Sequence, residues 1–261
     1  MDDRAEIIRT EALTKRFGSL IAVNRVSYVL RENEVAGIIG SNGAGKTTFF
    51  NLLSGYYQPD EGTIRFRDED ATQMTPQQRV ARGLMRTFQL TSTFENLSVV
   101  DNLVLAYFRL HRSARLLDLL FSTRSSQRPE PKVVQTLETF NLQDLRDRYV
   151  KHLSLGEKRR LEIAMAILSD PKVLLLDEPL AGLAETEIQS VLATLRQHVG
   201  RQTILIVEHK LAHVQDFVQR LTVMHDGQVI ADGNAAEALR HPDVRRSYWQ
   251  IDAPAEAITA A

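Results

Sequence analysis

The amino-acid sequence predicts an α/β fold with an antiparallel β lobe at its start and an inserted helical lobe. Three observations predict it. A glycine-rich segment over 40–48 follows the apolar run 35–39 and precedes a helical pattern. A second apolar run, at 173–176, ends in two adjacent carboxylates. Between these two predicted strands, apolar residues over 98–148 recur at helical intervals instead.

The composition is that of an ordinary globular protein. Its 261 residues, 43% of them hydrophobic, suffice to bury a large core in one domain or two coupled lobes. Because 32 Lys and Arg nearly balance 33 Asp and Glu, the overall charge gives no argument for nucleic acid or an anionic membrane. The lack of cysteine excludes disulfides, thiolate metal sites and a cysteine nucleophile, and agrees with a reducing cytosol.

From the first residues and the apolar runs we expect neither a signal peptide nor a membrane-spanning helix. The chain starts Met-Asp-Asp-Arg, with acid where a signal peptide carries base. No apolar run approaches the roughly 18 residues of a membrane span. Any membrane role is therefore expected to come through a partner.

Residues 6–32 alternate short apolar and polar runs, which predicts antiparallel strands ahead of the glycine-rich segment. Phe17 lies there on a predicted loop, directly before Gly18. An exposed aromatic side chain near a nucleotide site can stack on adenine, whereas a buried one packs in the core. The spacing leaves both open for Phe17.

The segment 40–48 is predicted to be a phosphate cradle. It matches the pattern G-x-x-x-x-G-K-[ST], in which glycines let successive backbone N–H groups converge on phosphate oxygens at the start of a helix, here expected over 47–54. Lys46 is expected to reach the terminal phosphates and Thr47 to ligate Mg²⁺. The other cradle residues are Gly40, Ser41, Asn42, Gly43, Ala44, Gly45 and Thr48.

After the cradle helix, a strand is expected near 63–66 and a short helix begins at Thr75-Pro76, a favourable N-cap and first-turn pair. Residues 84–89 resemble a buried strand that ends in Gln89. The amide of Gln89 can orient a water, touch magnesium or cap the next turn, and the spacing does not choose among these.

The region 98–148 predicts an all-helical lobe with a polar, proline-containing break at 122–131. Its first helix carries four basic residues beside an apolar run, and such a stretch can lie on a membrane or bind nucleic acid. A solvated face over a helical core is favoured, because only four bases cluster and no aromatic ladder interleaves with them. The four are Arg109, His111, Arg112 and Arg115.

Ser154 precedes a patterned helix over 158–168 and is a natural N-cap. The backbone N–H groups at the start of that helix are a second place where phosphate could bind. Taken by itself, however, Ser154 indicates only a helix cap. The strand at 173–176, apolar on both faces as in a parallel sheet, delivers Asp177 and Glu178 at its carboxyl end. Beside a phosphate cradle, Asp177 is assigned to magnesium and Glu178 to accepting a proton from an attacking water.

Helix 185–199 leads to strand 203–207, which ends in Glu208-His209. A histidine after a strand is often structural, but the carboxyl edge of a parallel sheet is where ligands bind, so both roles stay open for His209. The chain closes with a hairpin about Asp226-Gly227, helices over 235–240 and 242–249, and an alanine-rich tail, 251–261, expected to be loose.

In this order, these features closely resemble the ATPase subunit of an ATP-binding cassette (ABC) transporter over nearly the whole chain. The resemblance implies a P-loop NTPase with a RecA-like core and β lobe in 1–90 and 155–250, and a helical subdomain in 98–154. By position, the family motifs fall as follows: Phe17 on the adenine-stacking loop, 40–48 on Walker A, Gln89 on the Q-loop, Ser154, Gly156 and Glu157 on the signature, Asp177 and Glu178 on Walker B, 181–184 on the D-loop, and His209 on the switch histidine.

The resemblance also implies that two such subunits sandwich two ATP molecules with Mg²⁺, the signature of each completing the other's site. Water would then attack the γ-phosphate in line, polarised by Glu178. Lys46, magnesium and the partner's Ser154 would stabilise the developing charge, His209 would hold the γ-phosphate, and Gln89 would report it to the membrane subunit. The implied metal ligands are Thr47, Gln89 and Asp177.

Several further stretches look like the branched-chain amino-acid importer ATPases, a group that includes relatives moving urea, amides or aromatic acids. They are Arg-Thr-Phe-Gln at 86–89, Phe94 with the segment 99–106, the helix segment 158–164, and His-Pro-Asp-Val at 241–244. The implied partners are permease subunits, a second ATPase subunit, identical or different, and indirectly a substrate-binding protein, but no nucleic acid. The implied location is peripheral, on the cytoplasmic face of the inner membrane.

Two other functions have to be compared with that of an importer ATPase. A soluble ABC-type ATPase acting on nucleic acid or ribosomes typically carries two cassettes or a long coiled-coil insertion, and neither is present in this sequence. The second alternative is a nucleotide-binding regulatory module that does not hydrolyse ATP. Its support is Ala184, which stands where the D-loop is expected to have Asp or Asn. A partner subunit with an intact D-loop could compensate for Ala184.

The sequence departs from the family pattern at three further positions. Glu185 replaces the subgroup's usual Pro, and Leu155 and Glu157 replace the Gly and Gln that the wider family favours in the signature.

Overall fold

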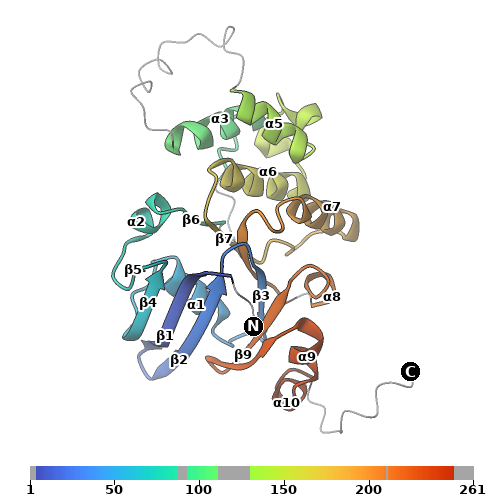
Figure 1. Ribbon diagram of the computed structural model, residues 1–261. Helices are drawn as coiled ribbons and strands as arrows, with labels where there is room; N and C mark the ends of the chain where they lie inside the picture. The colour runs from blue at the N-terminus through green and yellow to red at the C-terminus, as the bar shows by residue number, and fades with distance from the viewer. Residues whose placement is uncertain (1–3, 88–92, 111–129, 210, 250–261) are drawn as a thin grey trace, which may run out of the picture. The chain divides into compact units, whose positions relative to one another are not determined.

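The computed structural model describes residues 4–87, 93–110, 130–209 and 211–249 (Figure 1). Its contacts divide the chain into two compact units. The core unit comprises 1–86, 172–179 and 198–261, and the helical unit comprises 87–171 and 180–197. Gln89, most of the basic stretch after Arg109, and the tail 251–261 lie outside the described residues. No helix in the described parts is long and apolar enough to cross a membrane.

The β lobe of the core unit is one antiparallel sheet of four strands, in the order β2-β1-β4-β5. Ile8, Leu13 and Leu30 are fully or almost fully buried beneath it. The alternation in 6–32 therefore predicted these strands correctly, since every second side chain of a half-covered strand faces the core. The strands are β1 (Glu6–Phe17), β2 (Leu20–Arg31), β4 (Glu61–Phe66) and β5 (Glu69–Asp70).

The second sheet of the core unit has six strands in the order β10-β9-β3-β8-β7-β6, parallel except for the terminal β9–β10 hairpin. All residues of β3, β7 and β8 are buried, which explains why these strands are apolar runs without alternation. The strands are β3 (Val35–Gly40), β6 (Leu84–Arg86), β7 (Val173–Asp177), β8 (Thr203–Val207), β9 (Arg220–His225) and β10 (Gln228–Gly233).

The register of the central strands brings three predicted motifs to one sheet edge. Val207 of β8 is paired with Ile38 of β3 on one side and with Asp177 of β7 on the other. The three strands run parallel and end almost level. The cradle, Glu178 and His209 therefore all leave the sheet at its carboxyl edge.

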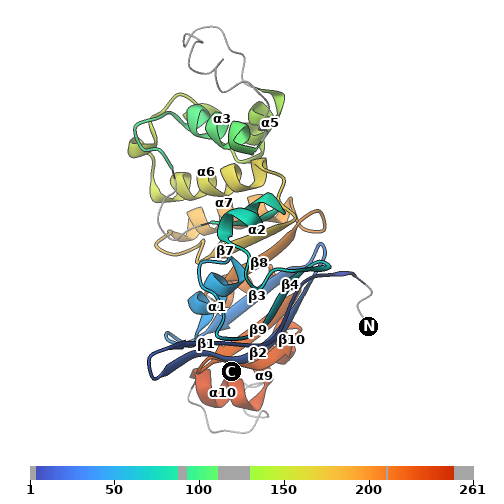
Figure 2. The ribbon, with the colours of Figure 1, turned by 90° about the vertical axis from the view of Figure 1, so that its left-hand side faces the viewer.

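Helix α1 (Lys46–Leu53) follows the cradle and contacts β2 of the first sheet and β3 and β7 of the second (Figure 2). It begins one position before the expected 47–54. Its last turn is held by the buried Arg79 of α2 (Pro76–Ala81), whose guanidinium donates hydrogen bonds of 2.6 Å to the carbonyls of Leu52 and Leu53. Burial lowers the pKa of Arg79 to about 10, so these carbonyl dipoles stabilise a costly charge that fixes the cradle helix.

The expected helices at the end of the chain are confirmed as α9 (Ala235–Arg240) and α10 (Pro242–Trp249), after the single turn α8 (Leu211–Val214). Among the described residues, the helical unit contains α3 (Val99–Leu110), α5 (Pro131–Thr139), α6 (Leu155–Leu168) and α7 (Glu185–Arg196), with short 3-10 turns at Gln143–Leu145 and Val150–His152. Helix α6 contacts α3, α5 and α7. This unit includes the expected helical region 98–154 and also α6 and α7.

Candidate functional site

The cradle requires glycine at both of its ends. Gly45, the residue before α1, has a φ of 93°, and a Cβ there would lie 2.2 Å from the carbonyl oxygen of Ala22. A Cβ on Gly40 would lie 2.3 Å from the carbonyl oxygen of Met224. The neighbouring backbone thus approaches too closely for any side chain, and the turn leaves the N-terminus of α1 open to an anion.

Lys46 lies inside the cradle rather than in solvent. It is 6% exposed, and its Nζ donates to the carbonyl oxygens of Gly40 at 2.7 Å and Ser41 at 2.9 Å. Burial lowers the pKa of Lys46, while the carboxylates of Glu178 and Asp177 oppose that shift. Phosphate oxygens would be stronger acceptors for this ammonium than the two neutral carbonyls.

Asp177 ends β7 as a buried carboxylate, 1% exposed. Its Oδ2 accepts a 2.6 Å hydrogen bond from Arg86, the last residue of β6. Its Oδ1 is buried and has no hydrogen-bond partner among the described residues. A buried acceptor left in that state is costly, which makes it a good ligand for a cation or its water.

Glu178 has a strained backbone and a different partner from Asp177. Its φ is 46°, in the left-handed region that non-glycine residues rarely adopt, and its N–H donates to Val207 at 2.9 Å. Its Oε1 lies 3.8 Å from Nδ1 of His209. Strain of roughly 1–3 kcal/mol at such a residue persists only where the surrounding structure imposes it, and here it turns the carboxylate toward the end of β8.

The described residues fit a magnesium ion that is bound together with a nucleotide. No described cluster of three or more His, Cys, Asp or Glu side chains could hold an ion alone. Mg²⁺ in nucleotide sites commonly takes one or two carboxylates, with phosphate oxygens and waters completing its octahedron. The unpartnered Oδ1 of Asp177 would supply the carboxylate, and the exposed Thr47 at the start of α1 would supply a hydroxyl.

Phe17 ends β1 and is 43% exposed, so packing in the core is excluded. Its ring contacts Tyr57 edge-on, with centroids 5.3 Å apart, and Nζ of Lys15 lies 5.7 Å from its centroid. These contacts hold one aromatic face at the surface of the β lobe, where a base could stack on it.

In the helical unit, Ser154 is the N-cap of α6 and forms a reciprocal capping box with Glu157. The N–H of Ser154 donates to Glu157 Oε2 at 2.7 Å, and the N–H of Glu157 donates to Ser154 Oγ at 3.2 Å. The expected cap is confirmed, and the side chain of Glu157 serves it.

A carboxylate that sequence reasoning missed lies on the same cap. Ser154 Oγ and the N–H of Gly156 both donate to Oε1 of Glu187, at 3.2 and 3.1 Å. The N–H of Ala184 donates to Oε2 at 3.1 Å, and these bonds hold the pKa of Glu187 below its usual value, the Ala184 bond most of all. A Cβ on Gly156 would lie 2.4 Å from Oε1. The donors of this cap therefore form an anion site, which an acid of α7 occupies.

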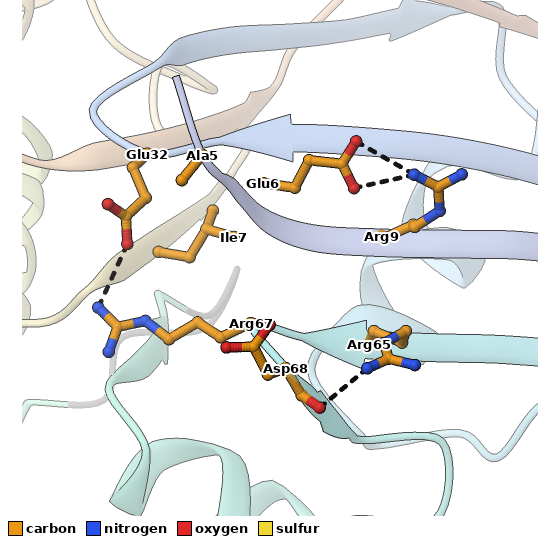
Figure 3. A pocket seen from close by; sticks show the side chains of 8 residues that line it. All are labelled: Ala5, Glu6, Ile7, Arg9, Glu32, Arg65, Arg67 and Asp68. Atoms are coloured by element: carbon orange, nitrogen blue, oxygen red, sulfur yellow. Dashed lines mark hydrogen bonds and ion pairs between the residues drawn. The ribbon is translucent and has the colours of Figure 1, made fainter. Parts of the chain in front are cut away.

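A hollow in the β lobe is unrelated to the cradle (Figure 3). Its volume is about 550 Å³, and its charged lining is paired within itself, Arg9 with Glu6 and Arg67 with Glu32. Arg9 and Arg67 thus have carboxylate partners, and the third guanidinium, that of Arg65, donates to the carbonyl oxygen of Asp68 at 2.9 Å. The full lining is Ala5, Glu6, Ile7, Arg9, Glu32, Arg65, Arg67 and Asp68.

The chain matches the family profile described as "ABC transporter" over residues 23–181, a span that includes the cradle, the α6 cap and both carboxylates. The chain belongs to the ABC transporter family. As a member of the ABC transporter family, it is an ATP-hydrolysing subunit with a P-loop NTPase fold.

Known ABC transporter proteins resemble the chain over almost its whole length. The high-affinity branched-chain amino acid transport ATP-binding protein LivG of Salmonella typhimurium is 38% identical, over 93% of this chain and 97% of its own. BraF of Pseudomonas aeruginosa, described in the same words, gives the same identity and coverage. The crystal structure of the ADP conformation of MJ1267, an ATP-binding cassette of an ABC transporter, superposes with a TM-score of 0.80 at 31% identity, over 94% of this chain and 99% of that one.

Proposed function

We propose that this chain binds and hydrolyses ATP at the cradle and thereby powers an ABC importer for branched-chain or related amino acids. The observation that carries the catalytic part is the convergence of Lys46, Asp177, Glu178 and His209 at the carboxyl edge of one parallel sheet. A cation, an ion-binding carboxylate and a base with a neighbouring imidazole are the parts that phosphoryl transfer to water needs.

The geometry of the core unit supports the following roles for the described residues. Lys46 exchanges its two carbonyl acceptors for phosphate oxygens and stabilises the charge that develops there. Glu178 accepts the proton of the attacking water, and His209 binds the γ-phosphate beside it. Thr47 and Asp177 would hold Mg²⁺, which when bound supplies positive charge to the phosphates. Gln89 is proposed to contact the same site and report on it, and Phe17 to stack on adenine.

We infer that a second ATPase subunit completes the site with its own signature cap. The two hydrogen bonds that Ser154 Oγ and the N–H of Gly156 donate to the carboxylate of Glu187 support this role, since the same donors could bind a phosphate oxygen. The γ-phosphate held by the facing subunit is the proposed natural occupant. Ala184 offers no side chain to cap α7 and uses its N–H instead, so the D-loop keeps a backbone anchor.

The proposed partners are the permease subunits of the importer and, through them, a substrate-binding protein, with this chain on the cytoplasmic face of the membrane. The amino-acid substrate rests on the names of relatives such as LivG and BraF. Purification of the chain with its associated permeases, reconstitution in vesicles and uptake assays test it. ATP-driven uptake of leucine, isoleucine or valine is expected; uptake of urea, amides or aromatic acids instead would reassign the substrate.

Replacement of Glu187 tests whether its carboxylate competes with a phosphate for the hydrogen bonds of Ser154 Oγ and the N–H of Gly156. The variant Glu187→Gln keeps the size of the side chain but removes the charge, so its oxygen competes less well with a phosphate. The ATP concentration for half-maximal hydrolysis by the transporter should fall about threefold or more. The matched control is Glu185→Gln, two residues earlier on α7, where the carboxylate accepts a hydrogen bond from Gln189 instead of the Ser154 and Gly156 donors. An unchanged or higher ATP requirement in Glu187→Gln would contradict the competition.

A further inference from the structure

Arg86 lies where it can control the carboxylate of Asp177. It is the last residue of β6, which pairs in parallel with β7 so that Arg86 is level with Leu175. Residues two apart on a strand face the same side, so Leu175 and Asp177 share a face. Nη2 of Arg86 donates to Asp177 Oδ2 at 2.6 Å, between side chains that are only 8% and 1% exposed.

The other side of the guanidinium is fixed to the cradle helix. Nη1 donates to Oδ1 of Asn51 at 2.6 Å and to Oγ of Ser54, the C-cap of α1, at 2.9 Å. The group also lies 5.9 Å from the ring centroid of Phe50 and 5.7 Å from that of Tyr56. Only a planar fork of donors can hold acceptors on both sides and contact two aromatic rings. One side chain thus links β6, β7 and α1.

This arrangement treats the two oxygens of Asp177 differently. Oδ2 is bound by Arg86, whereas the buried Oδ1 has no hydrogen-bond partner among the described residues. A carboxylate held by one oxygen cannot rotate freely, so the direction of the other oxygen is fixed.

We propose that Arg86 is a positioning residue for magnesium binding: it holds Asp177 by Oδ2 and the cradle helix by Asn51 and Ser54, so that Oδ1 is presented to the ion of Mg-ATP. The proposal rests on the function proposed for Asp177. Partners that orient a metal ligand typically change metal affinity by about 10- to 100-fold when they are replaced.

The test uses Mn²⁺ as the probe, with a non-hydrolysable ATP analogue and the EPR signal of free Mn²⁺. The substitution Arg86→Gln should weaken Mn²⁺ binding by about tenfold or more. Affinity for the analogue in EDTA should stay within about twofold of wild type, because the cradle itself is unchanged. A general structural defect would lower both affinities. The matched control, Arg82→Gln, removes an exposed pair with Glu69 and should change neither.

Unchanged Mn²⁺ affinity in Arg86→Gln would overturn the proposal. So would tighter binding, which is expected if the guanidinium only competes with the cation for Asp177. If Arg86→Gln does not fold, the variant Asn51→Ala is used, because it removes one acceptor of Arg86 Nη1 but leaves the ion pair with Asp177. Loss of Mn²⁺ affinity without loss of analogue affinity would support the positioning role. Unchanged Mn²⁺ affinity would refute the positioning role. Failure of Asp177→Asn to weaken Mn²⁺ binding would instead refute the metal role of Asp177 itself.

Discussion

Replacement of Glu178 by Gln should lower phosphate release from Mg-ATP by about 100-fold or more, while ATP binding persists. The amide keeps the shape of the side chain and its place beside His209 but cannot accept the proton of the attacking water, and a general base typically contributes about 10²–10⁴-fold. Steady-state phosphate release and equilibrium binding of a labelled ATP analogue measure the two effects separately.

The control for this variant is Glu69→Gln, which removes one charge from an exposed ion pair with Arg82 in the core unit. It should leave phosphate release within about twofold of wild type, because exposed pairs contribute little. Near-normal hydrolysis by Glu178→Gln would remove Glu178 as the base. Loss of ATP binding together with hydrolysis would mean that the strained backbone at this position had changed instead.

Replacement of Lys46 by Ala should weaken Mg-ATP binding by about 100-fold. The buried ammonium already has donors aimed into the cradle, at the carbonyls of Gly40 and Ser41, and its charge-assisted bonds to phosphate would be worth about 3 kcal/mol together. Isothermal titration with a non-hydrolysable analogue measures the loss.

Lys15→Ala is the matched lysine control, since Lys15 forms a surface pair with Asp60 and lies over the ring of Phe17. It should weaken nucleotide binding only slightly, through the aromatic ring. The thermal unfolding midpoint of Lys46→Ala should be recorded as well, because two cradle carbonyls lose their donor. Tight Mg-ATP binding by folded Lys46→Ala could not be reconciled with the cradle.

Local sequence patterns were sufficient to predict the cradle turn, the buried parallel strands and the last two helices. The spacing of 40–48 between an apolar run and a helix predicts the turn into α1, and unbroken apolar runs predict the buried parallel strands β3, β7 and β8. Helices α9 and α10 have the predicted bounds, since caps and proline mark their starts. Each of these features depends on neighbours within a few residues.

The missed features depend on contacts between distant residues. Arg86 and Asp177 are 91 residues apart along the chain, and Gly156 and Glu187 are 31 apart. Neither spacing is periodic. In the sequence, Arg86 stands out only as part of the Arg-Thr-Phe-Gln motif at 86–89. A basic residue at the end of a strand that pairs with β7 is the signal that could have predicted its ion pair with Asp177. The hydrogen bond from the N–H of Glu178 to the carbonyl of Val207 likewise depends on the strand order, which places β8 beside β7.

We propose that each ATP is enclosed by the cradle of one subunit and by the α6 cap, Ser154 and Gly156, of another. Sedimentation velocity tests this dimer, with Glu178→Gln to prevent hydrolysis, alone and mixed with any ATPase subunit that co-purifies. Mg-ATP should convert monomer into a dimer in one of these samples, and adding Ser154→Arg to Glu178→Gln should abolish that conversion. If ATP saturates a species that stays monomeric in both samples, or if a dimer forms that Ser154→Arg does not affect, the nucleotide is not enclosed between two subunits.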